Sequence, residues 1–374
     1  MKRRVVVWPS ESLRAGVKRR EFVSEYFDGD RLVTKRNVFF ETTSEGAGAS
    51  LPTADWALLS VLFNAMLYKR DIFIKAPISR QLVHNLDEFQ RAFNMWAPQL
   101  TVVDIRADQE LDIVPKHSTN EAVMTFSGGV DASFAAYRQI FKKPGYRHRD
   151  LKVAILAHGF DFSLGKQEPF DVARAAAEQM LEGTGVEVAV VRTNVRTIMK
   201  NWELAHGLAL AACLHLFSQR YQHGLIAGDE PYTNLQFPWG STPLTNHLLS
   251  NSNFSIETDG SAYTRTTKVM HLSSWKAAVN NVRVCWEGPK TGRNCGKCEK
   301  CIRTILNFRA CGLSLPSAFP CDVTDEQISL IKVRNNIQRD YLEDILRVAR
   351  ERYGDVRWVQ LLNDVIVKYN ARVG

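Results

Sequence analysis

The middle of the chain alternates short apolar runs with longer stretches that have helical spacing. The apolar runs predict buried strands at residues 121–126, 151–157, 186–192 and 224–227. Helices are expected between them, one beginning near Phe134 and others at 170–181 and 202–219. Because strands that alternate with amphipathic helices form parallel sheets covered on both faces, this region is predicted to be an α/β domain.

The two ends of the chain carry different patterns. Before residue 119, strands are expected at 38–43, 72–75 and 101–105, and helices from residue 53 or 55 to 67 and at 79–96. The polar stretch 106–120 is expected to separate this N-terminal α+β domain, 1–118, from the α/β domain, 119–322. The helical tail, 323–374, has helical spacing at 325–337, 342–353 and 358–369. It is expected to pack on the core or to form the surface of a homodimer.

The composition is that of an ordinary globular protein. The 374 residues are 45% hydrophobic and 24% charged, and no apolar run is long enough for a membrane-spanning helix. The N-terminus shows no secretory signal pattern. Seven cysteines, an odd number, favour reduced thiols. We therefore expect a cytoplasmic protein that has no membrane partner.

A glycine-rich turn follows the first strand of the α/β domain and precedes a helix. Its sequence is Ser127-Gly128-Gly129-Val130-Asp131-Ala132-Ser133. Glycines let backbone N–H groups approach an anion closely, and a helix N-terminus adds unpaired donors and partial positive charge. The hydroxyls of Ser127 and Ser133 can donate further hydrogen bonds. The segment predicts a phosphate-binding loop, with an ordinary glycine turn before a helix as the alternative.

The turn resembles the Ser-Gly-Gly-x-Asp-Ser signature of the PP-loop ATP pyrophosphatases. Those enzymes cleave ATP to AMP and pyrophosphate and adenylate a carboxylate or carbonyl oxygen. Here Ala132 stands where the family has the serine after the aspartate. The resemblance implies an adenine nucleotide alpha hydrolase-like fold, ATP as cosubstrate and Asp131 as a catalytic residue. It also implies that His158 lies at the strand end that meets the adenosine. The ATP-binding residues implied in this way are Ser127, Gly128, Gly129, Val130, Asp131, Ser133, His158 and Lys268.

Four cysteines lie close together downstream. Cys285 is followed by Cys295, Cys298 and Cys301, and this spacing suits tetrahedral zinc with four sulfur ligands. Because all four positions would be filled by protein, the zinc would be structural rather than catalytic. A redox Cys-x-x-Cys pair and an iron–sulfur cluster are the alternatives.

The phosphate loop and the four-cysteine knuckle, 285–301, together resemble the 7-cyano-7-deazaguanine synthase family, which turns a 7-carboxy-deazaguanine into a nitrile. In that family, too, an arginine follows the cysteine run, here Arg303. The likeness covers residues 119–312 and leaves the N-terminal domain unmatched. Lys268 resembles the family's lysine before the last catalytic helix. Together with Arg265 it could neutralise the charge that develops on departing pyrophosphate, which makes it a second catalytic candidate.

Other residues are expected around the phosphate loop. Asp131, Asp229 and Glu230 could hold Mg²⁺ beside the polyphosphate, because hard cations prefer carboxylates. Trp239 could stack on a flat substrate base, and Arg265 could contact the substrate. Helix-capping acids and a core aromatic are the alternatives. Residues 264–309 hold ten Lys/Arg against two acids, which fits an anionic ligand; a solvated face and tRNA binding both stay open.

The sequence therefore predicts an ATP-dependent ligase of the PP-loop type. It would adenylate an oxygen of a carboxylate or amide-like substrate, such as a deazapurine or another nucleobase, and ammonia or an amine would displace AMP. A thiolation enzyme that uses the same adenylation on tRNA or a small molecule is the first alternative, and a protein acceptor is also open. A non-catalytic nucleotide-binding protein is the second alternative, with Ala132 as a trace of lost chemistry.

Overall fold

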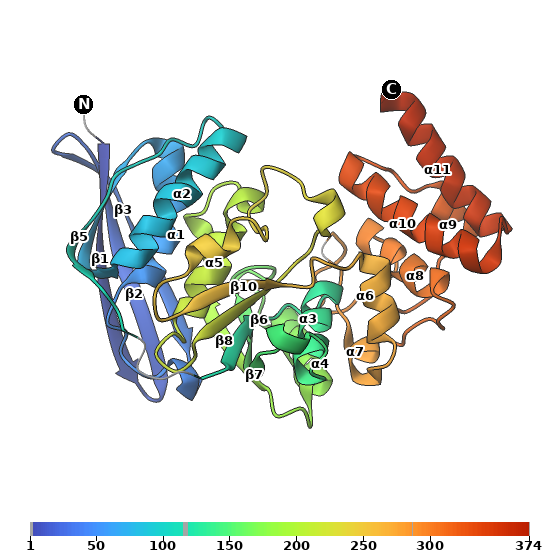
Figure 1. The fold of residues 1–374 in the computed structure, drawn as a ribbon, viewed down its shortest axis with the longest axis horizontal. Coiled ribbons are helices and arrows are strands. Elements are labelled where there is room, and N and C mark those ends of the chain that lie inside the picture. The colour runs from blue at the N-terminus through green and yellow to red at the C-terminus, as the bar shows by residue number, and fades with distance from the viewer. Residues whose placement is uncertain (1–2, 115–118, 286, 374) are drawn as a thin grey trace.

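One ten-stranded mixed sheet runs through the molecule (Figure 1). The computed structural model describes residues 3–114, 119–285 and 287–373. The strand order is β10-β9-β6-β7-β8-β3-β2-β1-β4-β5, and six of its nine pairings are parallel. The expected α/β class is thus confirmed. Within the described part of the chain, no helix is both long enough and apolar enough to cross a membrane.

The parallel half of the sheet follows the strand–helix alternation of the sequence. Its strands are β6 (Glu121–Thr125), β7 (Asp150–His158), β8 (Glu187–Thr193), β9 (His223–Ala227) and β10 (Ser255–Asp259). The helices between them are α3 (Val130–Ile140), α4 (Gln167–Leu181) and α5 (Trp202–His215). The first four strands match their predicted positions. β10 was not expected, because Ile256 is its only apolar residue and the short strand lacks an apolar run.

The N-terminal half adds five strands and two helices. The strands are β1 (Arg3–Arg14), β2 (Val17–Asp28), β3 (Arg31–Thr42), β4 (Asp71–Ser79) and β5 (Ile105–Leu111), and the helices are α1 (Asp55–Tyr68) and α2 (Arg80–Trp96). β3 pairs antiparallel with β8 through Phe40 and Glu41, which joins the two halves. The predicted boundary at residue 118 lies outside the described residues.

Two expectations for the N-terminal half were wrong. The strand expected at 101–105 shares only Ile105 with β5, which extends to Leu111 and so occupies the first part, 106–111, of the stretch expected to be a polar linker. β5 is an edge strand whose alternate residues are exposed and charged, so its apolar signal is weak. β1 and β2 were not expected at all. In β2 the buried face carries Lys18 and Arg20 beside Phe22, which breaks the alternation of apolar and polar residues.

Two hydrophobic cores lie on opposite faces of the parallel half. Alternate residues of β6 face opposite ways, so that Val123 joins the core under α1, α2 and α5, whereas Ala122 and Met124 join the core with α3. The first core also contains Val5 and Phe22 of the N-terminal strands. The N-terminal region therefore packs on the α/β region through a continuous sheet and a shared core.

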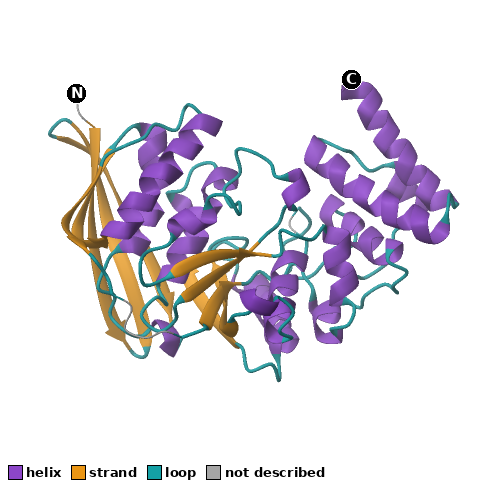
Figure 2. Ribbon diagram, in the orientation of Figure 1, coloured by secondary structure: helices purple, strands orange, loops and turns teal. Residues whose placement is uncertain are grey.

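The C-terminal part is helical, as predicted (Figure 2). Its helices are α6 (Arg265–Leu272), α7 (Lys276–Asn281), α8 (Glu299–Ala310), α9 (Asp325–Ser329), α10 (Asn336–Tyr353) and α11 (Arg357–Val373). The predicted helix 325–337 is in fact divided, because α9 ends at Ser329 and α10 begins at Asn336. The apolar faces of α10 and α11 join the second core. The tail thus packs on the α/β region.

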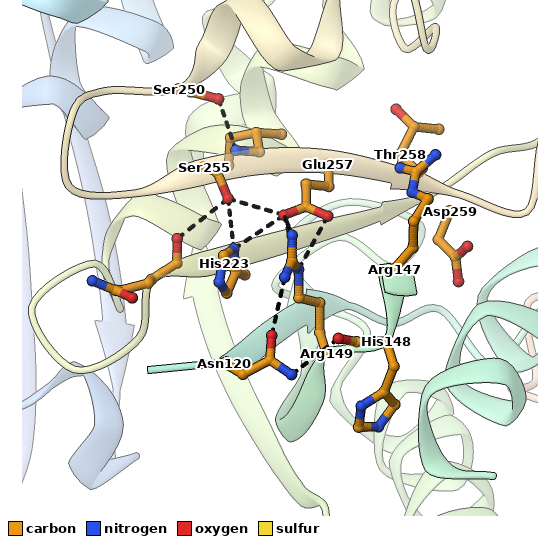
Figure 3. Close-up of polar contacts among 12 residues, drawn as sticks. Asn120, Arg147, His148, Arg149, His223, Ser250, Ser255, Glu257, Thr258 and Asp259 are labelled. Atoms are coloured by element: carbon orange, nitrogen blue, oxygen red, sulfur yellow. Dashed lines mark hydrogen bonds and ion pairs between the residues drawn. The ribbon is translucent and has the colours of Figure 1, made fainter. Parts of the chain in front are cut away.

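A polar network ties the amino ends of the parallel strands together (Figure 3). The Arg149 guanidinium donates to both carboxylate oxygens of Glu257, and Ser255 Oγ donates to the same carboxylate at 3.1 Å. His223 Nδ1 lies 2.8 Å from Ser255 Oγ. Burial alone would raise the pKa of Glu257, but hydrogen bonds from His223 and Arg149 outweigh it and hold that pKa at about 2. Glu257 is therefore ionised. The network holds together the amino ends of the strands, which lie at the opposite end of the sheet from the phosphate loop.

Candidate functional site

The glycine-rich turn lies between β6 and α3, and the helix begins inside the motif at Val130. Gly128 has φ +71°, a conformation that residues with a side chain seldom adopt, and Gly129 caps the helix. Ser127 Oγ accepts a hydrogen bond from Gly129 N at 3.3 Å, and the residue is exposed. From the knuckle region, Arg283 N donates to Gly128 O at 2.8 Å. The turn thus has the form of an anion cradle at a helix N-terminus.

Asp131, in the first turn of α3, pairs with two cations of α6. Its carboxylate lies 2.6 Å from Arg265 Nη2 and 2.8 Å from Lys268 Nζ. Lys268 Nζ also donates to Gly228 O, at the end of β9, at 2.5 Å. Burial would raise the pKa of Asp131, but the charges of Arg265 and Lys268 outweigh it and lower that pKa to about 2. The cluster therefore ties the phosphate loop to α6 and to the loop after β9.

A cavity of about 240 Å³ opens beside the phosphate loop. It is lined from the carboxyl ends of β6, β7 and β9, which is where ligands bind in parallel sheets. Ser127, Asp131 and Ala132 form its wall on the loop side, and Asp229 lies on the wall after β9. Its inner wall is apolar and consists of Phe126, Ile155, Leu156, Ala157, Leu210, Ile226 and Ala227. An apolar chamber beside an anion cradle suits a ligand with a flat base and a phosphate chain.

Several predicted ligand residues do not line this cavity. Ser133 is fully buried, and its hydroxyl donates to Met180 Sδ, so that Ala132 holds the cavity-facing position. The His158 ring is buried and stacked on Phe170 at 4.2 Å, while the backbone neighbour Ala157 reaches the cavity. Lys268 and Arg265 lie behind Asp131. Neither side chain lines the cavity, and both contact the site only by pairing with the Asp131 carboxylate.

A second cavity, of about 110 Å³, adjoins the first. The two share Asp161, Phe162, Trp202 and Arg283 in their walls. Arg283 Nη2 lies 2.7 Å from the Asp161 carboxylate. The additional cations of the second cavity are Arg196, Lys290 and Arg293. Part of the basic segment predicted to hold an anion therefore faces a concave surface beside the phosphate loop.

The predicted magnesium ligands are divided between two environments. Asp131 and Asp229 line the larger cavity, whereas Glu230 accepts a hydrogen bond from the Tyr341 hydroxyl of α10. Burial, and then the charge of Asp229, raise the pKa of Glu230 to about 7. In the described residues, the four cysteines form the only grouping of three or more possible metal ligands. A magnesium site on Asp131 and Asp229 stays a prediction.

Trp239 does not line the larger cavity but contacts two residues that do, Asp229 and His206. Its Nε1 donates to Asp229 Oδ2 at 2.8 Å, and its ring meets His206 edge-on at 5.4 Å between centroids. Its predicted role as a stacking platform for a base is untested, and its visible role is to hold Asp229 and His206 in place.

The helical tail reaches the site through Tyr341, a residue that no sequence motif singles out. Its ring lies under the guanidinium of Arg303, at 4.0 Å, and that of Arg265, at 5.4 Å. Its hydroxyl donates to Glu230. Nearby, Asn234 Nδ2 donates to Asp340 Oδ2 at 2.9 Å. The tail thus supports both α6 and the loop after β9.

The four cysteines converge in a way that could hold a metal such as zinc. The Sγ atoms of Cys285, Cys295, Cys298 and Cys301 all lie within 4.8 Å of one another. The Cys285–Cys298 and Cys295–Cys301 sulfur separations are 3.8 and 3.9 Å. Four sulfurs bound to one tetrahedral zinc at about 2.3 Å would lie about 3.8 Å apart, so the geometry fits the ion.

The local chain explains why these sulfurs meet. Gly296, at φ +70°, turns the chain between Cys295 and Cys298, and α8 begins directly after Cys298. Asn294 Oδ1 accepts hydrogen bonds from Val284 N and Cys285 N, while its Nδ2 donates to Val282 O and Ala318 O. This one buried amide therefore fixes the segment that ends at Cys285 beside the turn that carries Cys295 and Cys298.

Comparisons of the chain with protein-family models, with curated proteins and with solved structures give no match. The interpretation of the site consequently rests on its own residues and geometry. The resemblance of the phosphate loop and the cysteine knuckle to known families stays a hypothesis from sequence.

Proposed function

We propose that this protein is an ATP-dependent ligase that forms AMP and pyrophosphate and activates an oxygen of a carboxylate or amide-like substrate. One observation carries the proposal. The Ser-Gly-Gly-Val-Asp turn joins a parallel strand to a helix N-terminus and opens into a cavity at the carboxyl end of the sheet. That combination of anion cradle and apolar chamber suits the phosphates and the base of a nucleotide.

The residues have complementary roles in this proposal. Ser127 and the amide groups after Gly128 bind phosphate oxygens, and Asp131 and Asp229 supply carboxylates for a magnesium ion on the polyphosphate. The cationic second cavity, with Arg196, Lys290 and Arg293, receives the charged part of the acceptor. Most of the catalytic effect comes from positioning and electrostatic stabilisation. The four-cysteine site holds structural zinc.

The remaining cysteines favour a nitrogen nucleophile over sulfur. Burial raises the pKa of the Cys213 thiol, and burial likewise raises that of Cys311 to about 11. Cys321 is exposed, and none of the three lines either cavity beside the phosphate loop. A thiolation enzyme would need a reactive thiolate within reach of the activated substrate. The proposed second substrate is therefore ammonia or an amine.

Replacing Ser127 by Ala should lower AMP formation by at least about 10²-fold, as for the loss of one donor to developing charge. Because Ser127 is exposed and its hydroxyl bonds only within its own turn, the melting temperature should hardly change. The assay measures AMP and pyrophosphate from ATP, Mg²⁺, ammonium and 7-carboxy-7-deazaguanine, the acid that the family resemblance suggests. Ser163→Ala, at an exposed serine on the same rim, is the matched control. Unchanged turnover in the Ser127 variant would refute the proposal that this turn binds the phosphates of ATP.

The nucleophile is tested with a triple variant, Cys213→Ala, Cys311→Ala and Cys321→Ser. It should keep most of its turnover and lose some stability, since the buried Cys213 and Cys311 side chains are truncated. Pyrophosphate release and product formation are measured separately. If the variant still releases pyrophosphate but forms no product, sulfur is the nucleophile and the enzyme is a thiolation enzyme.

A further inference from the structure

His206, on α5, is one of the residues that line the larger cavity. Its Nδ1 lies 3.0 Å from Glu203 O and 3.3 Å from Trp202 O. Carbonyl oxygens only accept hydrogen bonds, so Nδ1 must carry the proton and donate it. In the neutral ring the other nitrogen, Nε2, then has a free lone pair. No hydrogen bond to Nε2 is found in the part of the chain that the structure describes.

The ring is held in this position from several sides. Trp239 meets it edge-on, and Trp239 Nε1 is itself bound to Asp229. Gly240 N donates to Glu203 O at 2.9 Å, so the loop after Trp239 is fastened to the start of α5. A Cβ atom at Gly240 would lie 2.6 Å from His206 Nδ1, which shows how closely the backbone covers the ring. His206 is thus a rigid, oriented group.

Burial also lowers the pKa of His206, and the charges of Asp229 and Glu203 offset only part of this effect. The imidazole is therefore neutral near pH 7. This agrees with the tautomer that the two carbonyl contacts require.

The other ionisable groups in the wall of this cavity are already engaged. Asp131 is paired with Arg265 and Lys268, and Asp161 is paired with Arg283. The two oxygens of Asp229 accept hydrogen bonds from Glu230 N and Trp239 Nε1. Among the described residues of the wall, His206 is consequently the neutral base with an uncommitted lone pair.

We propose that His206 Nε2 accepts a proton from the nitrogen nucleophile of the second half-reaction. This rests on the proposed ligase function. An ammonium ion, or a protonated amine, gives one proton to Nε2, and its freed lone pair forms the new C–N bond. The C–O bond to AMP breaks, and its electron pair leaves on the AMP phosphate oxygen. The nitrogen releases a further proton to solvent as the amide forms, so that one proton rests on His206 and AMP departs as the anion.

The test compares two nucleophiles in the His206→Gln variant. Ammonium must lose a proton before it can attack, whereas hydroxylamine is largely uncharged at neutral pH and attacks adenylates without help. The variant should form the amide from ammonium on the order of 10²–10⁴-fold more slowly than the parent. Pyrophosphate release in the presence of hydroxylamine should stay close to the parent rate. His84→Gln, at an exposed histidine of α2, is the control.

Two results would overturn the inference: equal rates with ammonium in variant and parent, or an equal loss with both nucleophiles. The second would indicate damage to nucleotide binding instead. If the parent releases no pyrophosphate with either nucleophile, the ligase proposal itself fails. The protonation state of His206 can then be tested by a measurement that needs no acceptor substrate. Nitrogen NMR of the histidine rings, with His206 assigned from the variant, should show a neutral ring protonated at Nδ1, and protonation at Nε2 or a charged ring at pH 7 would refute a free lone pair.

Discussion

Replacing Asp131 by Asn should abolish AMP formation and also destabilise the fold. The carboxylate is the partner of both Arg265 and Lys268, whose side chains are only 5% and 1% exposed. An amide leaves two buried cations without a counter-charge, and breaking such a cluster typically costs about 3–5 kcal/mol. Thermal melting and chemical unfolding measure the loss, and pyrophosphate release measures the activity. Normal turnover in this variant would contradict the assignment of the phosphate loop.

The pH dependence of stability gives an independent check on the same cluster. The pKa of Asp131 is about 2 in the folded protein, below the value of about 3.9 for an unfolded aspartate. The stabilisation from its charge is therefore fully present above about pH 4 and is lost as the pH falls through about 2. The Asn variant should show less loss of stability over this window than the parent. If both proteins lose stability in parallel, Asp131 is not held ionised by its neighbours.

Lys268→Ala separates the two roles of the cluster. It leaves Asp131 paired with Arg265 but removes the link to Gly228 O. Adenylation should slow by about 10²–10³-fold, because the Asp131 carboxylate at the cavity wall is held less firmly in position. Because Lys268 does not line the cavity, this effect would act through the position of Asp131. If the Asn variant at Asp131 does not fold, Ser127→Ala still tests the phosphate loop, since Ser127 lies outside the ion cluster.

The parallel half of the fold could be predicted because its strands are continuous apolar runs. β6 and β7 are buried on both faces, and such strands stand out from the helices between them. β1 and β2 could not be found in this way. Their pairing in one sheet buries Lys18 and Arg20, which are balanced by Glu11 from β1. Burial of a cation costs little free energy only when an anion pairs with it. That anion can be identified only once the pairing of the strands is known.

The parts of the candidate site that could be predicted are formed by residues close together in the sequence. The parts that depend on contacts between distant segments could not be predicted. The turn 127–131 and the cysteines 295–301 are short motifs whose spacing alone suggests their chemistry. His206 carried only a weak signal, because it is one of two histidines in a mostly apolar helix. Tyr341 carried none, because its contacts with Glu230, Arg265 and Arg303 depend on how the tail folds back. Ser133 shows the converse error, since its place in the motif suggested a phosphate contact but its side chain faces the core.

The knuckle should hold one tightly bound zinc ion per chain, and Cys298→Ser should lower both its occupancy and the stability of the protein. A bound metal would order the knuckle, so its binding energy would contribute directly to folding. A decrease in melting temperature of at least about 5 °C is expected. Elemental analysis of the freshly purified protein measures zinc and iron together. Cys321→Ser, at an exposed cysteine outside the cluster, is the matched control and should retain the metal.

The loss of zinc should also weaken nucleotide binding, because the knuckle and the phosphate loop are connected. Arg283 lies two residues before Cys285, and its backbone N–H donates to Gly128 O while its side chain pairs with Asp161. If the knuckle loosens, Arg283 loses its fixed position, and the turn loses the two hydrogen bonds that Arg283 donates to Gly128 O and Ser127 O. The Cys298 variant should therefore bind ATP less tightly in calorimetry even at temperatures where it remains folded. Unchanged ATP affinity in a folded, metal-free variant would show that the two sites are independent. Protein with neither zinc nor iron that melts like the parent would refute the metal site itself.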